Sequence, residues 1–489
     1  MDAGTIPGQR VGMLSMPARV LAILAAAVLP AVARPVPAQD TVAGRRGPKP
    51  PNVLLVVLDD LNDWVGPLGG HPQAATPHLD RFAATAVTFT RAVCAAGSCN
   101  PSRTALFTGR TPRSTGLLRN VQDMREVLPD EVLLPRHLAN HGYRALGGGK
   151  LLHYFVDPRS WDDYFPSIER RSPFPRTLYP EQRPVSLPRE PWMYVETDWG
   201  PLDATLDEYG GDYLVANWAR GELAQDHELP RFVAAGIYRP HEPWFVPRPY
   251  FDRFPLEDVQ LPPGVLDGDL DDLPPAGRKR GPNRYLAHIR EHGQWRAGVQ
   301  GYLASIAFAD DMLGRILEAV DSGPRRDDTV VIVTSDHGWH LGEKEHWQKF
   351  TGWWRCARVP LFVRVPPGYA ALVDGTPAGA RCDAPVTLLD LFPTICELAG
   401  VPPKDELGGE SLLPRLRDPG GASDRVVATW FGHRDAIALT GPRYRYIHYP
   451  DGGEELYDLD ADPHEWRNLA GDAEHVDVLT AMRAALPGD

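Results

Sequence analysis

Cysteine is scarce in this chain, with five among 489 residues. The five positions show neither metal-ligand spacing nor a disulfide framework, and the sequence does not say how they would pair: Cys94, Cys99, Cys356, Cys382 and Cys396. Positive charge is also in deficit, since 51 Lys and Arg stand against 64 Asp and Glu, a formal net charge of −13. This balance argues against a nucleic-acid partner. An anionic substrate stays open, because a local cluster of basic side chains decides the potential inside a cleft.

Long apolar runs are missing after the first 50 residues, so the sequence predicts no stable membrane insertion. The run near the N-terminus, residues 20–32, follows Arg19 and precedes small residues typical of a cleavage site. We predict a signal peptide at 1–38 and a linker at 39–50. An uncleaved membrane anchor is the alternative. The signal peptide predicts an exported protein, either periplasmic or extracellular.

What the chain does have is a set of apolar segments that run into ionisable residues. Residues 53–58, 143–146, 231–237 and 329–334 are predicted strands, and the first is a continuous apolar run of the kind buried on both faces of a parallel sheet. In open α/β sheets, ligands bind outside the carboxyl ends of the strands. Parallel strands would therefore bring six side chains to one edge: Asp59, Asp60, Lys150, His241, Asp336 and His337.

The length and composition, 43% hydrophobic and 24% charged, predict a folded protein of two or three units. We predict the α/β class, with a large, mostly parallel central sheet flanked by helices over 51–420 and a small antiparallel sheet with a final helix over 421–489. Residues 299–320 carry an apolar stripe at helical spacing. Asp310 falls inside that stripe, which favours a structural hydrogen-bonding role over a catalytic one. Residues 160–226 are predicted to be loops beside the cleft.

The most specific motif is Cys99-Asn100-Pro101-Ser102-Arg103, closed by Thr108-Gly109-Arg110. Pro101 suits a first helical turn and Gly109 a helix end, which predicts a short helix over 102–108. Residue 99 would then lie at a helix N-terminus, where free N–H groups favour an anion such as sulfate. The alternative is an ordinary buried cysteine before a helix.

Further motifs accompany this one along nearly the whole chain after Pro51. They are the segments 52–55 leading into Asp59-Asp60, 76–80 (TPHLD), 149–153 (GKLLH), 239–243 (RPHEP), 335–339 (SDHGW) and 455–463. On these residues the chain resembles the type I, formylglycine-dependent sulfatases of the alkaline phosphatase superfamily, and most closely the iduronate-2-sulfatase branch. The resemblance implies an alkaline phosphatase-like fold and a sulfuric ester hydrolase.

The resemblance implies one divalent cation held by Asp59, Asp60, Asp336, His337 and the modified Cys99. Three carboxylates favour Ca²⁺, with Mg²⁺ as the alternative. Cys99 would be oxidised to formylglycine by a separate formylglycine-generating maturation enzyme. The hydrated aldehyde would attack sulfur and give a covalent sulfated intermediate, which eliminates sulfate when a base takes a proton.

The same resemblance assigns roles to five further residues. Arg103 would orient the nucleophile and the metal ligands, and Lys150 and Lys349 would bind sulfate oxygens. His153 would be the base for elimination, and His241 would bind sulfate or protonate the leaving oxygen. Four other residues could line the substrate pocket or simply pack: His340, His346, Trp353 and Trp354.

The implied substrate is a sulfated small molecule or saccharide, of the 2-O-sulfated uronate kind. One alternative is a phosphonate or phosphate monoester hydrolase on the same scaffold, where anion charge and pocket shape would differ. The other is a glycan-binding relative that has lost catalysis.

Overall fold

The computed structural model describes residues 49–180 and 196–488. The predicted signal peptide at 1–38 and residues 39–48 of the predicted linker lie outside the described residues. Lys49–Asp489 form one compact unit. Along the described residues, no helix is both long and apolar enough to cross a membrane.

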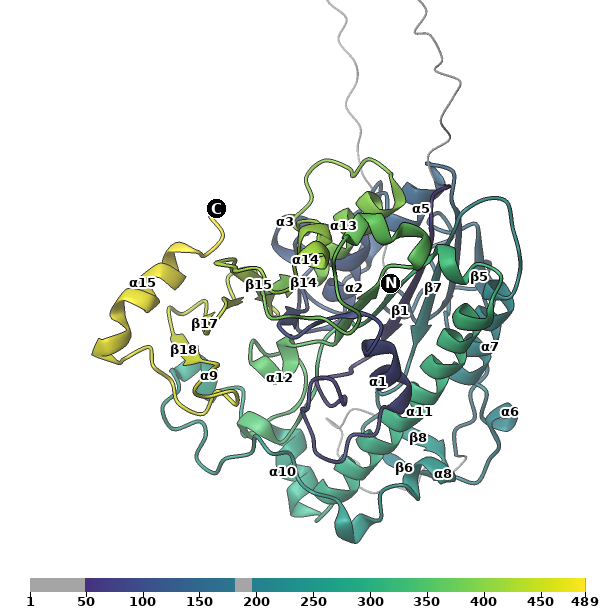
Figure 1. The fold of residues 1–489 in the computed structure, drawn as a ribbon. Coiled ribbons are helices and arrows are strands. Elements are labelled where there is room, and N and C mark those ends of the chain that lie inside the picture. The colour runs from purple at the N-terminus through teal and green to yellow at the C-terminus, as the bar shows by residue number, and fades with distance from the viewer. Residues whose placement is uncertain (1–48, 181–195, 489) are drawn as a thin grey trace, which may run out of the picture. The chain divides into compact units, whose positions relative to one another are not determined.

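An eight-stranded sheet lies at the centre of this unit (Figure 1). Its strands follow the order β13 (Arg381–Cys382), β2 (Val87–Phe89), β12 (Leu361–Arg364), β9 (Thr329–Ser335), β1 (Asn52–Leu58), β7 (Arg231–Ile237), β4 (Arg144–Gly149) and β5 (Asp163–Phe165). Strand β1 runs parallel to both β7 and β9, and β4 runs parallel to β7 and β5. Only β12 is antiparallel to its neighbours β9 and β2. The predicted mostly parallel sheet is confirmed, and so are its four predicted strands.

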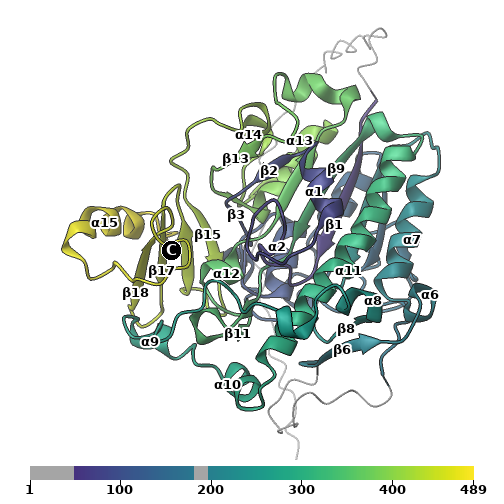
Figure 2. The same ribbon diagram turned by 60° about the horizontal axis from the view of Figure 1, so that its bottom comes forward.

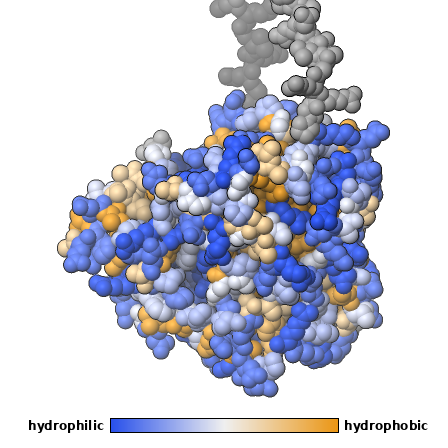
Figure 3. Space-filling view, in the orientation of Figure 1, coloured by the Kyte–Doolittle hydropathy of each residue, from blue (hydrophilic) through white to orange (hydrophobic). Residues whose placement is uncertain are grey.

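Helices cover both faces of the sheet because β1 is apolar on both. Leu54 and Val56 enter one hydrophobic core, whereas Val53 and Leu55 enter another. The first core contains residues of α1 (Pro77–Ala83), α7 (Asp212–Leu223) and α11 (Trp295–Ser322), and the second residues of α2 (Cys99–Thr108), α5 (Leu134–Ala139) and α13 (Leu391–Ala399). Figure 2 shows the strands between these two groups of helices. The face drawn in Figure 3 is mainly hydrophilic, with hydrophobic side chains in small groups.

Helix α11 confirms the long helix predicted over 299–320. Both carboxylate oxygens of Asp310 accept backbone hydrogen bonds at the start of α1, from the N–H groups of His78 and Leu79, each at 2.9 Å. Asp310 therefore has the structural hydrogen-bonding role that its place in an apolar stripe indicated.

The prediction of loops over 160–226 is wrong near the start of the range and over its last part. This range contains β5, β6 (Trp199–Leu202), α6 (Leu206–Tyr209) and the twelve-residue helix α7. Strand β6 pairs in parallel with β8 (Trp244–Pro247). The buried positions of α7 include Ala216 and Ala219, whose small side chains give only a weak apolar stripe.

The C-terminal sheet is antiparallel throughout, as predicted. It consists of β15 (Val427–Trp430), β16 (Ile437–Thr440), β17 (Tyr444–His448) and β18 (Glu454–Asp458), followed by α15 (Val476–Ala484). Strand β18 has a weak apolar pattern because Glu455 is buried in it. Its carboxylate accepts hydrogen bonds from Trp353 Nε1, Tyr449 and Tyr457 at 2.6–2.8 Å.

Shorter elements complete the structure. The helices are α3 (Pro112–Thr115), α4 (Met124–Val127), α8 (Arg248–Phe251), α9 (Pro275–Arg278), α10 (Arg284–Glu291), α12 (Trp354–Ala357) and α14 (Leu413–Arg417). Two-stranded pairings join β3 (Ala92–Val93) to β14 (Val386–Thr387) and β10 (His340–Leu341) to β11 (Trp347–Gln348).

Candidate active site

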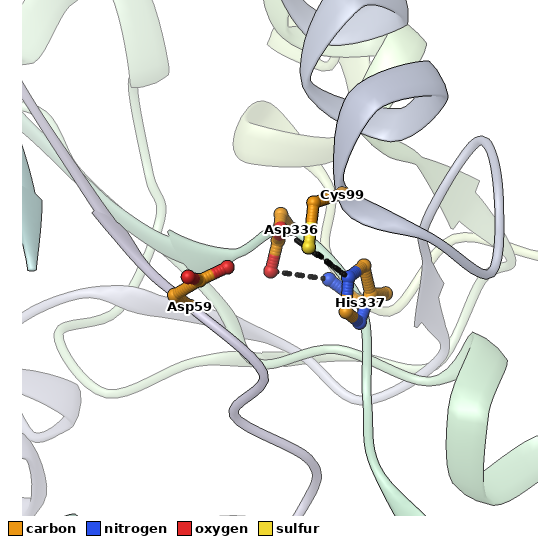
Figure 4. A group of neighbouring side chains, drawn as sticks. All are labelled: Asp59, Cys99, Asp336 and His337. Carbon is orange, nitrogen blue, oxygen red and sulfur yellow. Dashed lines mark hydrogen bonds and ion pairs between the residues drawn. The ribbon is translucent and has the colours of Figure 1, made fainter. Parts of the chain in front are cut away.

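The carboxyl ends of β1 and β9 bring acidic residues together. Asp59 and Asp60 follow β1, and Asp336 and His337 follow its parallel neighbour β9. Donor atoms of Asp59, Cys99, Asp336 and His337 all lie within 4.8 Å of one another, and all four residues are fully buried (Figure 4). His337 Nε2 lies 3.4 Å from carboxylate oxygens of both Asp60 and Asp336. Asp59, Asp336 and His337 thus lie together with Cys99, and Asp60 lies beside them in a second group with Cys99 and His241.

Cys99 enters this cluster from the first residue of α2. Gly109 ends the helix in a left-handed conformation with φ 67°, and its N–H bonds to the carbonyl of Ala105. The helix begins at Cys99, three residues before its predicted start at Ser102. In Figure 4 the thiol points from the helix end toward Asp336 and His337.

Positive charges surround the Cys99 sulfur. Lys349 Nζ is 3.0 Å from Sγ, His337 Nε2 is 3.3 Å away and Lys150 Nζ is 3.8 Å away. Burial alone would raise the pKa of this thiol, but Lys150, Lys349 and His337 more than offset burial and place the pKa well below its usual value. The sulfur lies where the oxygens of formylglycine would lie after conversion, so the same cations would face those oxygens.

Arg103 joins the two carboxylates that flank Cys99. It lies one helical turn after Cys99, on the same face of α2. Its Nη2 donates to Asp59 Oδ1 at 2.8 Å, and its Nε donates to Asp336 Oδ2 at 2.9 Å. The guanidinium is 1% exposed, so both ion pairs are shielded from water. Arg103 thereby links the segments that follow β1 and β9.

The remaining predicted residues lie around the same cluster. Lys150, which follows β4, forms an ion pair with Asp59. Lys349 Nζ lies 2.7 Å from Asp60 Oδ1, and His241 Nε2 lies 3.6 Å from Asp60 Oδ2. The structure brings these residues together from segments almost 300 positions apart in the chain.

Residues 51–401 match the sequence profile of the sulfatase family, and residues 342–488 match that of the C-terminal region of N-sulphoglucosamine sulphohydrolases. The chain belongs to the sulfatase family. It is a sulfuric ester hydrolase with the alkaline phosphatase-like fold of type I sulfatases.

Individual relatives cover most of this sulfatase. A protein named sulfatase from Formosa agariphila is 34% identical over 449 residues, which cover 89% of this chain and 86% of that protein. Human iduronate 2-sulfatase is 28% identical, with 88% of this chain and 93% of the relative covered. The crystal structure of a phosphonate monoester hydrolase from Agrobacterium radiobacter superposes with a TM-score of 0.65 at 26% identity, covering 89% and 94%.

The donor set of the sulfatase fits the divalent cation that the family implies. Asp60 Oδ2 is buried and accepts no hydrogen bond from the described residues. Burial raises the pKa of Asp336. The positive charges of Arg103 and His337 offset part of this rise, and the pKa is about 7. Burial lowers the pKa of His337, but Asp336 and Cys99 raise it to about 9. A cation bound by Asp336 and His337 would therefore compete with protons for these two ligands.

A cavity of about 300 Å³ opens beside the cluster in the sulfatase. Three predicted residues line it, namely His153, His241 and Lys349. Sequence reasoning missed the other lining residues: Asn120, Tyr154, Glu242, Tyr285, Trp339, Gln348 and Phe350. Tyr154, Glu242, Gln348 and Phe350 are direct sequence neighbours of predicted site residues, which is the one signal that could have found them.

Four residues were further candidates for the pocket lining, but they are buried in the protein and do not line this cavity: His340, His346, Trp353 and Trp354. His340 is fully buried, and its Nε2 lies 2.8 Å from Thr351 Oγ1. Trp353 is 1% exposed and donates to Glu455. All five cysteines are buried free thiols.

Proposed function

We propose that this sulfatase removes sulfate from a sulfated glycan, of the 2-O-sulfated uronate kind, with formylglycine made from Cys99. The observation that carries the proposal is the ring of Lys150, Lys349 and His337 around Sγ of Cys99, beside three carboxylates. The iduronate 2-sulfatase likeness supports a uronate substrate.

Hydrated formylglycine would supply a nucleophilic oxygen, and a divalent cation held by Asp59, Asp60, Asp336 and His337 would lower the pKa of that oxygen. Lys150 and Lys349 bind the sulfate oxygens, where their charges offset negative charge that develops as the ester bond breaks. Arg103 holds Asp59 and Asp336 in position.

Two histidines are suited to opposite proton transfers. Burial lowers the pKa of His241, but Asp60 more than offsets it, so the pKa is raised and the ring can protonate the leaving oxygen. Burial lowers the pKa of His153 despite Cys99, and its Nδ1 has no hydrogen-bond partner among the described residues. A neutral ring in that place can accept a proton. Environments that push two pKa values apart are typical of an acid–base pair.

We further propose that the protein is exported by the signal peptide at 1–38, followed by the linker at 39–50, to the periplasm or the exterior. It would be converted by a formylglycine-generating enzyme and would use Ca²⁺, with Mg²⁺ as the alternative. The catalytic part would span 51–420 and the C-terminal part 421–489.

The test is a pair of measurements on protein from its own host. Mass spectrometry of the peptide containing Cys99 should find the aldehyde, and Cys99→Ala should abolish turnover while the variant stays folded. A free thiol in active enzyme would contradict the proposed nucleophile.

The phosphonate monoester hydrolase likeness supports a second candidate, hydrolysis of a phosphonate or phosphate monoester. Rates on matched sulfate and phosphate monoesters of one alcohol separate the two. We expect a higher kcat/KM for the sulfate. A non-catalytic glycan-binding relative would turn over neither.

A further inference from the structure

Two active-site loops are tied together by a buried hydrogen bond that none of the proposed roles includes. His241 is followed by Glu242 in the loop after β7, and Lys349 is preceded by Gln348 at the end of β11. Gln348 Nε2 donates to Glu242 Oε1 at 2.8 Å. Glu242 is fully buried and Gln348 is 7% exposed.

Both partners are fixed by further contacts. Thr197 Oγ1 donates to the same Glu242 oxygen at 3.1 Å, and Tyr238 donates its hydroxyl to the Glu242 carbonyl at 2.9 Å. That carbonyl also lies 2.5 Å from His241 Nδ1. Gln348 has a φ of 82°, a left-handed conformation that a non-glycine residue keeps only when its surroundings hold it.

The two loops also pack through Trp244 and Trp347, whose ring centroids lie 5.7 Å apart. Apolar packing is not directional. The hydrogen bond is directional, so it fixes the registration of one loop against the other.

We infer that Glu242 and Gln348 are positioning residues that set the distance between His241 and Lys349. These two residues bind the sulfate ester in the proposed mechanism. The inference rests on the roles proposed above for those two cations. His241 and Lys349 both lie against Asp60. A shift of either loop would therefore move the side chain of His241 or Lys349 relative to the sulfur atom of the bound sulfate ester. A misplacement of about 1 Å can lower a rate about 100-fold.

The test exchanges the donor and the acceptor. Gln348→Glu places two carboxylates face to face, and we expect kcat/KM for a sulfate ester to fall about 100-fold. Adding Glu242→Gln restores a donor and an acceptor with their places reversed, and should recover at least about tenfold of that loss. Gln348→Leu removes the donor without adding charge and should lose about tenfold, which keeps the test open if the acidic variant does not fold.

Thr197→Val is the milder variant: it removes a hydroxyl that donates to Glu242 and accepts from Gln348 at 3.4 Å but keeps the bond between those two residues, and we expect a loss of about threefold or less. Formylglycine content is measured in every variant, so incomplete conversion is not mistaken for lost positioning. A double variant no better than Gln348→Glu would overturn the inference, and so would variants that lower Tm but keep kcat/KM. A wild-type enzyme without sulfate ester turnover would overturn the proposed function as well.

Discussion

At the scale of single residues, Arg103 contributes most to the organisation of the site. One guanidinium binds two buried carboxylates from different strands, and its Nη1 also donates to the Lys150 carbonyl at 2.5 Å. Its planar fork makes this possible, whereas a lysine ammonium could not span both carboxylates in the same way.

We expect Arg103→Gln to lower the free energy of unfolding by about 3 kcal/mol, because Asp59 and Asp336 each lose a buried ion pair and keep only Lys150 and His337 as charged partners. Turnover should fall with it. Urea unfolding at saturating Ca²⁺ measures the stability change. Arg364→Gln is the control: it breaks the more exposed Asp321 pair at 2.7 Å and should change stability by less than about 1 kcal/mol. Equal losses in both variants would contradict the assigned role.

His71 predicts how stability depends on pH. Its Nδ1 accepts from the Gln73 N–H at 3.1 Å and its Nε2 lies 3.2 Å from the Gln260 carbonyl, so the neutral ring is fully satisfied. Burial lowers its pKa to about 4. The ring takes up a proton near pH 6.5 in the unfolded chain but only near pH 4 in the folded protein. The contribution of the neutral ring to stability is therefore complete above pH 6.5 and is lost as the pH falls toward 4.

Between pH 7 and pH 5 this histidine should account for a loss of up to about 2 kcal/mol. Urea midpoints of wild type and His71→Gln at the two pH values measure it. The variant should show the smaller drop, and parallel drops would rule out His71 as the source.

At the scale of elements, the N-terminus of α1 is capped by a side chain from another helix, α11. Thr76 precedes α1 but makes no side-chain cap, and Asp310 of α11 binds the first free N–H groups instead. Free N–H groups at a helix start need such partners.

We expect Asp310→Ala to lower the free energy of unfolding by about 1–3 kcal/mol, since two buried N–H groups lose their acceptor. Asp310→Asn should lie between this variant and wild type. Asp311→Ala, at the neighbouring and more exposed position, is the control. The kcat/KM at 25 °C should stay unchanged in all three, and a large loss in Asp310→Ala alone would return Asp310 to the catalytic candidates.

Elements also show where sequence reasoning succeeds. Strands such as β1 and β9 are apolar runs buried on both faces, and their pattern alone predicts them. Helix α7 buries two alanines beside Val215 and β18 buries a glutamate, so the apolar pattern of each is weak. Contacts with the surrounding elements, more than their own apolar patterns, account for the helix and the strand that these segments form.

At the scale of the whole molecule, the proposed metal site joins the end of β1, the start of α2 and the end of β9, which are far apart in the chain. A cation that binds only the folded protein stabilises it by mass action, about 2.7 kcal/mol at 100 times its Kd. Cation removal should therefore lower Tm as well as activity.

We expect a chelator to lower the Tm of the wild-type enzyme by a few degrees, and Ca²⁺ to restore it, measured by calorimetry. Asp336→Asn should lose most of this response, whereas Asp310→Asn should keep it. Repeating the titration with Mg²⁺ identifies the preferred cation. No Tm response to either ion would contradict the metal site.

The sequence by itself determined the parallel strands, the helix behind Cys99 and the set of ionisable residues at one edge, because these depend on local apolar patterns and on motifs a few residues long. Only the tertiary structure decided that Lys349 and His337 lie against the Cys99 sulfur, that Asp310 starts α1, and that Glu242 meets Gln348. Those contacts join residues more than 100 positions apart, and their geometry is set by how whole elements pack.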